Sequence, residues 1–195
     1  MEGYYLFFDC ECTGLSSEDD ITQLALISTD KNLKIVSCKN LYFDTDKIIS
    51  EEVFNITKVD NEMLKKLSKG QRFKDRVEEI LSWFEGKVII GHNIEFDIKM
   101  VKSNALRCGK DLKFKSKICT MKRYVNLLHL PGGFDGQYKN PNLRELSRFA
   151  SHERKETVED IQNHFLKVFN MDGTSMYHDA LYDTFVTYYC FTVYK

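Results

Sequence analysis

The sequence Tyr4-Tyr5-Leu6-Phe7-Phe8-Asp9-Cys10-Glu11 joins an aromatic and aliphatic run to two acidic residues two positions apart. The run Tyr4–Cys10 predicts a buried central strand. Because alternate residues of a strand share a face, Asp9 and Glu11 project on the same side, with Cα atoms about 7 Å apart. Two acids at a solvated strand end would need no function, yet the carboxyl end of a buried strand is also where sites form in α/β proteins.

Around this stretch, the spacing of apolar residues predicts one mixed sheet covered by helices. Short apolar segments broken by polar turns predict antiparallel strands at Ile21–Ser28, Leu33–Ser37 and Leu41–Phe43. Two further strands are predicted at Val88–Ile90 and near Ile118–Cys119. Apolar residues at helical spacing predict helices at 73–84, 94–105, 120–128, 143–150, 158–169 (with Thr157 as cap) and from about 179. This order of elements indicates the α/β class.

Length and composition fit one soluble globular domain, with 195 residues of which 43% are hydrophobic and 29% charged. The formal net charge of −1 gives no overall attraction to a polyanion, so binding of phosphate would depend on a local patch or on bound cations. The six cysteines form no CxxC pair, which is typical of reduced thiols in a cytoplasmic protein. Cys10 and Cys12 could bind a soft metal, but no second pair or nearby histidine supports such a site.

The first apolar run is too short for a signal peptide or a membrane span. The cytoplasm is therefore the expected location. No repeat or low-complexity segment divides the chain, so a single domain over residues 1–195 is expected.

Two further acids lie in helices with apolar faces. Asp97 flanks an apolar stripe, where interaction with the helix dipole is the simplest role, and Asn93 is placed to cap the same helix. Asp183 lies in a helix that is apolar enough to be largely buried. An unpaired carboxylate in such a place would cost several kcal/mol of folding free energy. No lysine or arginine occurs in that helix before Lys195. A metal ion shared with the other three acids would satisfy all four together.

Oxygen ligands of this kind select hard cations, so Mg²⁺ or Mn²⁺ is expected. A pair of such ions suits phosphodiester hydrolysis, since one prepares the attacking water and the other stabilises the leaving 3′ oxygen. His178, five residues before Asp183, is the candidate general base, because an unperturbed histidine titrates near pH ~6.5. Taken alone, His178 would more often be a surface or capping residue.

Three segments in this order resemble the exonuclease motifs of the DnaQ-like family. They are Phe8-Asp9-Cys10-Glu11-Cys12-Thr13-Gly14, His92-Asn93-Ile94-Glu95-Phe96-Asp97 and His178-Asp179-Ala180-Leu181-Tyr182-Asp183. The third has the HxxxxD form of the DEDDh subgroup, whereas the sister DEDDy subgroup has tyrosine where this chain has Asp179. Phe54-Asn55-Ile56-Thr57 is similar to the family's linker between the first two motifs. The resemblance spans nearly the whole chain. It implies an RNase H-like fold with a central mixed five-stranded sheet flanked by helices, and 3′-to-5′ exonuclease activity.

The resemblance also implies roles for single residues. The implied metal ligands are Asp9, Glu11, Asp97 and Asp183, which would hold two Mg²⁺ (or Mn²⁺) ions, with Asp9 bridging them and Asp97 acting directly or through water. These four acids and the base His178 form the implied catalytic set. The implied substrate contacts come from Glu11, Thr13, Gly14, Leu15, His92, Asn93 and Phe96. Among them, Glu11 would touch the terminal 3′-hydroxyl, and Leu15 would wedge against the bases.

The chain departs from the family pattern in three places. Cys12 stands where threonine is usual, and Phe54-Asn55 stands where His-Gly is common, but neither position holds a ligand. The stretch between Ala150 and His178 is longer than expected and predicts an extra helical insertion around 153–175. Its exposed face could bind a partner or shape the substrate path, although surface decoration is the simpler explanation.

The first functional hypothesis is a metal-dependent 3′-to-5′ exonuclease that acts on single-stranded nucleic acid, DNA preferred, in proofreading, repair or end trimming. The same chemistry on RNA ends, as in RNase T-like enzymes, is the alternative, because contacts to a 2′-hydroxyl cannot be read from sequence. A non-catalytic module that binds nucleic acid or docks on a DNA polymerase would be signalled by loss of an acidic ligand, and all four are present.

A nucleotide-binding regulator lacks a phosphate-cradling GxxxxGK motif. Nine basic residues between Lys99 and Arg123, with Asp111 as the one acid, form a candidate contact to a phosphate backbone. A solvated basic helix face would explain the same run. The oligomeric state stays open.

Overall fold

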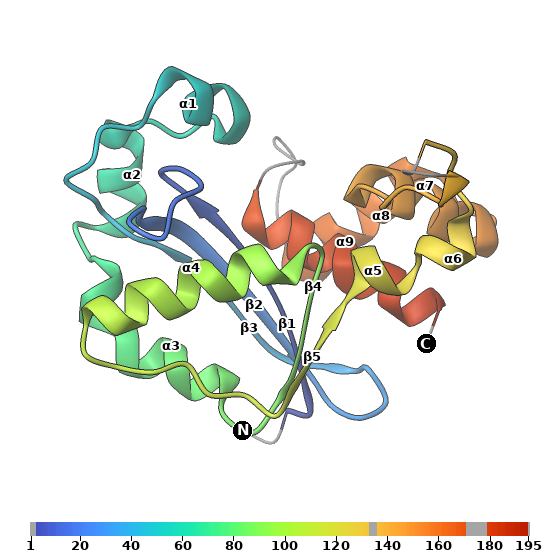
Figure 1. Cartoon of the computed structure of the whole chain (residues 1–195), viewed down its shortest axis with the longest axis horizontal. Helices are drawn as coiled ribbons and strands as arrows, with labels where there is room; N and C mark the ends of the chain where they lie inside the picture. The colour runs from blue at the N-terminus through green and yellow to red at the C-terminus, as the bar shows by residue number, and fades with distance from the viewer. Residues whose placement is uncertain (1–2, 133–135, 171–178, 195) are drawn as a thin grey trace.

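The computed structural model describes residues 3–132, 136–170 and 179–194. Within these residues, five strands form one mixed sheet with the order β3-β2-β1-β4-β5 (Figure 1). The central strand β1 (Tyr5–Cys12) pairs antiparallel with β2 (Ile21–Thr29) and parallel with β4 (Val88–Gly91). β4 pairs parallel with β5 (Ser116–Cys119). The strand predicted to be central is therefore the middle of the sheet.

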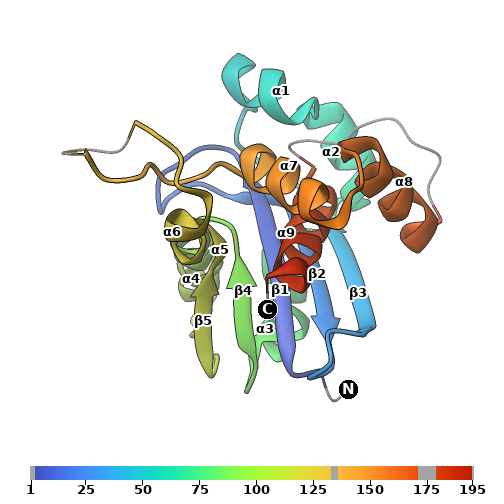
Figure 2. The same ribbon diagram turned by 90° about the vertical axis from the view of Figure 1, so that its right-hand side faces the viewer.

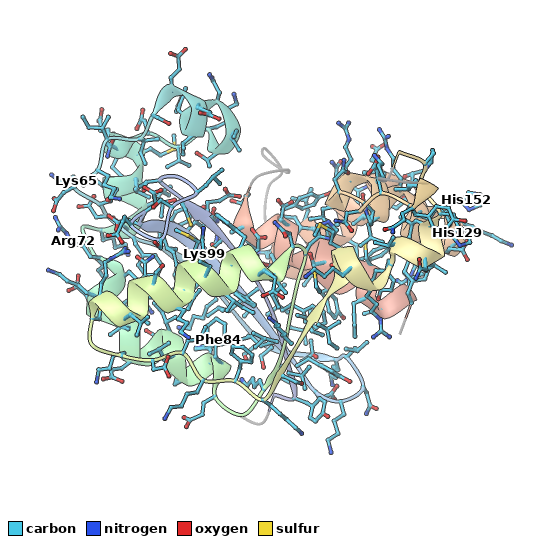
Figure 3. The ribbon with its side chains drawn as sticks, viewed as in Figure 1. Lys65, Arg72, Phe84, Lys99, His129 and His152 are labelled. Carbon is cyan, nitrogen blue, oxygen red and sulfur yellow. The ribbon has the colours of Figure 1, made fainter. Side chains whose placement is uncertain are left out.

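Helices cover both faces of the sheet, which explains why β1 is apolar on both sides (Figure 2). On one face, Phe8 packs edge to face against Phe84 of α3 (Val77–Phe84), with ring centroids 5.0 Å apart (Figure 3). On the other face, Phe7 packs against Phe191 of α9 (Ala180–Val193), with ring centroids 5.6 Å apart. The helix α4 (Ile94–Arg107) packs on the first face, and α7 (Leu143–Arg154) joins α9 on the second.

β3 (Ile35–Tyr42) is one continuous strand, so the prediction of separate strands at Leu33–Ser37 and Leu41–Phe43 was wrong. Lys39 and Asn40, which suggested a break, pair in register with β2. Both are exposed because β3 forms the edge of the sheet. Polar side chains on an edge strand interrupt the apolar pattern without interrupting the hydrogen-bond ladder.

Between β3 and β4 the chain forms α1 (Glu51–Thr57), α2 (Asn61–Ser68), the 3₁₀ turn η1 (Phe73–Arg76) and α3. The predicted helix at 73–84 corresponds to η1 and α3 together. α1 was not predicted from apolar spacing, and it buries none of its residues. After β5, two short helices, α5 (Thr120–Arg123) and α6 (Val125–Leu128), replace the single helix predicted there.

α8 (Val158–Phe169) begins at Thr157, whose side chain accepts a hydrogen bond from the amide of Asp160, as predicted for its cap. α8 lies within the stretch 153–175, whose status as an insertion in the family stays a prediction. α9 buries ten of its 14 residues, in agreement with its apolar sequence. No helix among the described residues is both long enough and apolar enough to cross a membrane.

Candidate active site

Three carboxylates from distant parts of the sequence meet at the carboxyl end of β1. Asp9 and Glu11 come from alternate positions of β1, and Asp183 comes from the first turn of α9. One ligand oxygen from each lies within 4.8 Å of the others. Oxygens at this spacing can contact one cation, because metal–oxygen distances are about 2.0–2.6 Å.

Asp97 reaches the same cleft from the opposite face of the sheet. It lies in the first turn of α4 and is 3% exposed. Its Oδ1 accepts a hydrogen bond from the backbone N–H of Cys10 at 3.1 Å and another from the Cys10 thiol at 3.3 Å. The cleft, which we call the acidic cleft, has a volume of about 410 Å³ and is lined by Asp9, Cys10, Glu11, Leu15, His92, Asn93, Phe96, Asp97, Leu143 and Asp183.

The electrostatics of the acidic cleft fit a hard divalent cation. Burial raises the pKa of Asp9 and of Glu11 well above the values of free carboxyl groups, and the neighbouring acids raise both further. Burial also raises the pKa of Asp97 to about 7. In the described part of the chain, no lysine or arginine forms a salt bridge with any of these three acids. Buried oxygen ligands that repel one another are stabilised by such a cation.

His92 and Asn93 line the acidic cleft, but their local contacts were not foreseen. The ring nitrogens of His92 lie 3.0 Å from the Thr120 hydroxyl and 3.0 Å from the Pro141 carbonyl. Burial lowers the pKa of His92 to about 4. Its implied substrate contact stays a prediction, and a contact through a ring nitrogen would disrupt one of these bonds. Asn93 precedes α4 in a left-handed conformation with φ 61° and makes no side-chain capping bond, so the expected side-chain cap was wrong.

The turn after β1 holds three further residues implied to contact the substrate, which are Thr13, Gly14 and Leu15. Leu15 is 78% exposed, and Lys99 on α4 donates to its carbonyl at 2.5 Å (Figure 3). The Thr13 hydroxyl donates to Asp19 at 3.2 Å. A Cβ at Gly14 would lie 2.5 Å from an Asp19 carboxylate oxygen, so a larger residue would displace that carboxylate. The turn therefore has a defined shape beside the acidic cleft.

A second pocket, of about 400 Å³, shares Cys10, Glu11, Leu15 and Phe96 with the acidic cleft and has α1 as a wall. Val53 and Ile56 of α1 line it together with these residues. Their part in the site was missed from sequence. The sequence did hold one signal for α1, because serine is a favoured cap residue and Ser50 directly precedes the helix. In the structure, the Ser50 side chain accepts a hydrogen bond from the amide of Val53.

Asp179 ties the start of α9 to the sheet. One oxygen of its carboxylate accepts hydrogen bonds from two amides in the first turn of α9. The other oxygen accepts from Gln23 at 3.2 Å and from the Tyr42 hydroxyl at 3.4 Å. Gln23 lies directly opposite Glu11 in the sheet. These bonds place Asp183, one turn further along α9, beside the end of β1.

His178 lies outside the described residues, so its role as general base stays a prediction. Among the four described histidines, His92 lines the acidic cleft with both ring nitrogens already engaged. His129 and His152 lie at the far end of the molecule, near α6 and α7 (Figure 3). His164 packs edge-on against an aromatic ring of α9. None of these four therefore presents an unshared ring nitrogen to the cleft.

Several residues of the basic run between Lys99 and Arg123 form hydrogen bonds or surface ion pairs within the protein. Arg107 donates to backbone carbonyls of the turn after β1 and pairs with Asp20. Lys110 pairs with Glu78, and Lys117 pairs with an acid of α4. These residues hold elements together, which limits the basic surface left for a phosphate backbone.

Comparisons with known proteins agree with this arrangement. The family model RNase_T, described as "Exonuclease", matches residues 6–191. A PolC-type DNA polymerase III from Caldanaerobacter subterraneus subsp. tengcongensis is 30% identical over 110 residues, which cover 56% of this chain and 8% of the polymerase. The DNA polymerase III subunit epsilon of Treponema pallidum is 29% identical over 104 residues, which cover 53% of this chain and 46% of the subunit.

Among solved structures, E. coli exonuclease I in complex with a dT13 oligonucleotide matches with a TM-score of 0.73 and 18% identity. The match covers 98% of this chain and 40% of exonuclease I. Together with the five-stranded mixed sheet, it confirms the RNase H-like fold that the motifs imply. The matched parts are less than half of the length of each of these relatives.

Proposed function

This chain belongs to the DnaQ-like exonuclease family of the RNase H-like superfamily, and on that basis we propose that it is a metal-dependent 3′-to-5′ exonuclease. It would hydrolyse the terminal phosphodiester bond of a single strand, DNA preferred, and release 5′-mononucleotides. The observation that carries the proposal is the meeting of Asp9, Glu11 and Asp183 within 4.8 Å. Asp97 adds a fourth carboxylate in the same cleft.

We propose two Mg²⁺ or Mn²⁺ ions as cofactors. Asp9, Glu11 and Asp183 would hold one ion, with Asp9 shared with the second, and Asp97 would contact an ion directly or through water. When bound, such ions activate an attacking water and stabilise the charge that develops on the leaving 3′ oxygen. The raised pKa values of Asp9 and Glu11 support metal binding, because a cation offsets the cost of keeping neighbouring carboxylates charged in a partly buried site.

The substrate end would lie between the acidic cleft and the second pocket. Leu15, which is exposed at their junction, would wedge against the bases, and Glu11 would contact the terminal 3′-hydroxyl. Phe96, Val53 and Ile56 would give the terminal base an apolar surface. Contacts from the remaining implied residues, Thr13, Gly14, His92 and Asn93, are proposed on the motif resemblance alone.

His178 would take the proton of the attacking water and so complete a DEDDh-type catalytic set. Its place in the third motif, five residues before Asp183, supports this role. His178→Ala should keep metal binding and slow turnover about 10²–10⁴-fold, because general-base catalysis contributes that much. An unchanged rate would remove His178 from the mechanism.

DNA is the preferred substrate in this proposal because the relatives are named as DNA polymerase III components, and the exonuclease I structure holds a dT13 oligonucleotide. Those names also make a DNA polymerase the candidate partner. The free state of all six cysteines supports the cytoplasm as the proposed compartment.

Degradation of matched oligonucleotides tests the proposal. A 5′-labelled DNA strand and an RNA strand of the same sequence are incubated with the protein and Mg²⁺, Mn²⁺ or a chelator. We expect a ladder of products shortened from the 3′ end, faster loss of DNA than of RNA, and no reaction with the chelator. Cleavage at internal positions alone would contradict an exonuclease, and faster loss of RNA would overturn the DNA preference.

A further inference from the structure

Cys10 occupies a position that the metal and substrate roles leave unexplained. It lies between Asp9 and Glu11 in β1 but projects to the opposite face, among the residues of the core beneath α4, and it is 4% exposed. From there, its backbone amide and its thiol both reach the same oxygen, Oδ1 of Asp97. One residue therefore makes two hydrogen bonds to a buried carboxylate 87 positions away in sequence.

Asp97 has few other sources of stabilisation. It is almost fully buried, and within the residues that the structure describes no lysine or arginine pairs with it. A buried carboxylate is strongly favoured by donors that reach it. The hydrogen bonds from Cys10 act against the effect of burial on the pKa of Asp97.

The thiol of Cys12 is placed so that the Cys10 thiol can act as a donor to Asp97. The sulfur of Cys12 lies 3.7 Å from the sulfur of Cys10, and either atom can be the donor. When Cys12 donates to the Cys10 sulfur, the Cys10 hydrogen is left to donate to Asp97. Cys10 is 4% exposed and Cys12 is 8% exposed, so little water reaches these weak donors.

We propose that Cys10 is a positioning residue, whose thiol and amide fix Oδ1 of Asp97 and so orient that carboxylate within the acidic cleft. Its consequence for turnover rests on the proposed function, because the orientation of Asp97 affects rate through the bound metal and the substrate. Partners that orient a metal ligand typically change metal affinity or activity 10–100-fold when they are replaced. Simple core packing is the competing explanation, since buried cysteine also behaves as a small apolar residue.

Three variants separate these explanations. Cys10→Ala removes the side-chain donor, whereas Cys10→Ser keeps a donor at the same position. Cys190→Ala is the matched control, because Cys190 is fully buried in the core on the other face of the sheet and makes no contact with Asp97. For each protein we would measure Mn²⁺ affinity by calorimetry, kcat and KM on the labelled DNA strand, and the melting temperature.

We expect Cys10→Ala to weaken Mn²⁺ binding or lower kcat by about 10–100-fold with little change in KM. Cys10→Ser should recover most of that loss, and Cys190→Ala should lower the melting temperature while leaving Mn²⁺ affinity and kcat unchanged. Wild-type values for Cys10→Ala would overturn the inference, and so would equal loss in Cys10→Ala and Cys10→Ser. If the wild-type protein binds Mn²⁺ but degrades no strand, the proposed function fails, and the Mn²⁺ affinities of the variants still decide the role of Cys10.

Discussion

Asp9 and Glu11 show how a two-residue spacing on a strand becomes a chemical site. Their side chains share the face of β1 that α9 covers, so Asp183 of α9 lies against both. Burial, and after it the neighbouring acids, raises the pKa of Asp9 and of Glu11, which means that their charged forms are destabilised when no cation is present. The same residues that favour metal binding therefore weaken the metal-free fold.

Asp9→Asn should separate these two effects. In a chelator, the variant should melt a few degrees above wild type, because it removes one partly buried negative charge from the cluster. In a protein of this size, about 1 kcal/mol of stability corresponds to roughly 2–4 °C in melting temperature. Turnover should fall at least about 10²-fold, since a proposed metal contact is lost and a bound ion contributes several kcal/mol of transition-state stabilisation. Asp111→Asn, at an exposed acid, is the control for both measurements. A variant less stable than wild type in the chelator would contradict the repulsion argument.

The raised pKa of Asp97 predicts that the stability of the metal-free protein depends on pH. Burial raises its pKa to about 7 in the folded state, whereas an unfolded aspartate titrates near ~3.9. Between these values the folded protein holds a proton that the unfolded chain has released. The free energy of unfolding should therefore fall as the pH rises from about 4 to about 7, and this contribution should be constant above that range.

Urea unfolding in a chelator measures this slope. Asp97→Asn has no proton to release at this position, so its stability should decline less than that of wild type over the same pH range. Comparison of the two proteins cancels the titration of groups that are distant from Asp97. A wild-type slope that is equal to or shallower than that of Asp97→Asn would show that the pKa of Asp97 is not raised.

α9 connects stability to the site, because its first turn carries Asp183 and its N-terminus is capped by Asp179. Asp179→Ala should lower stability by about 0.5–2 kcal/mol through loss of the cap. It should also lower turnover, because the bonds from Gln23 and Tyr42 that tie α9 to the sheet are lost. Thr157→Ala removes the cap of α8 and is the matched control. We expect Thr157→Ala to lower stability by a similar free energy, measured as a lower melting temperature, with no change in turnover.

The whole molecule should respond to divalent ions, since the acidic cleft joins β1, α4 and α9. A ligand at 100 times its dissociation constant stabilises the folded state by about 2.7 kcal/mol. Saturating Mg²⁺ or Mn²⁺ should therefore raise the melting temperature by several degrees, and a chelator should reverse the rise. For Asp183→Asn, the same ions should raise the melting temperature much less. An identical rise in wild type and Asp183→Asn would place the ion elsewhere.

Several features of the fold and the site were determined by the sequence itself. The apolar run of β1, the cap at Thr157 and the apolar length of α9 are properties of adjacent residues, and each was found from spacing or residue type. The three motifs were sufficient to identify the acids of the cleft. Such predictions succeed because capping, strand alternation and helix periodicity depend on neighbours within a few positions.

Only the tertiary structure decided which of these residues touch. Lys39 and Asn40 break a local pattern, yet pairing with β2 keeps β3 whole. Local signals gave no indication that Cys10 holds Asp97 or that Val53 of α1 lines the second pocket. These contacts join segments up to 87 positions apart, and they form because burying both faces of one sheet brings α4 and α9 to the same end of β1. Packing of distant elements, rather than the preference of any single segment, sets the geometry of the four carboxylates.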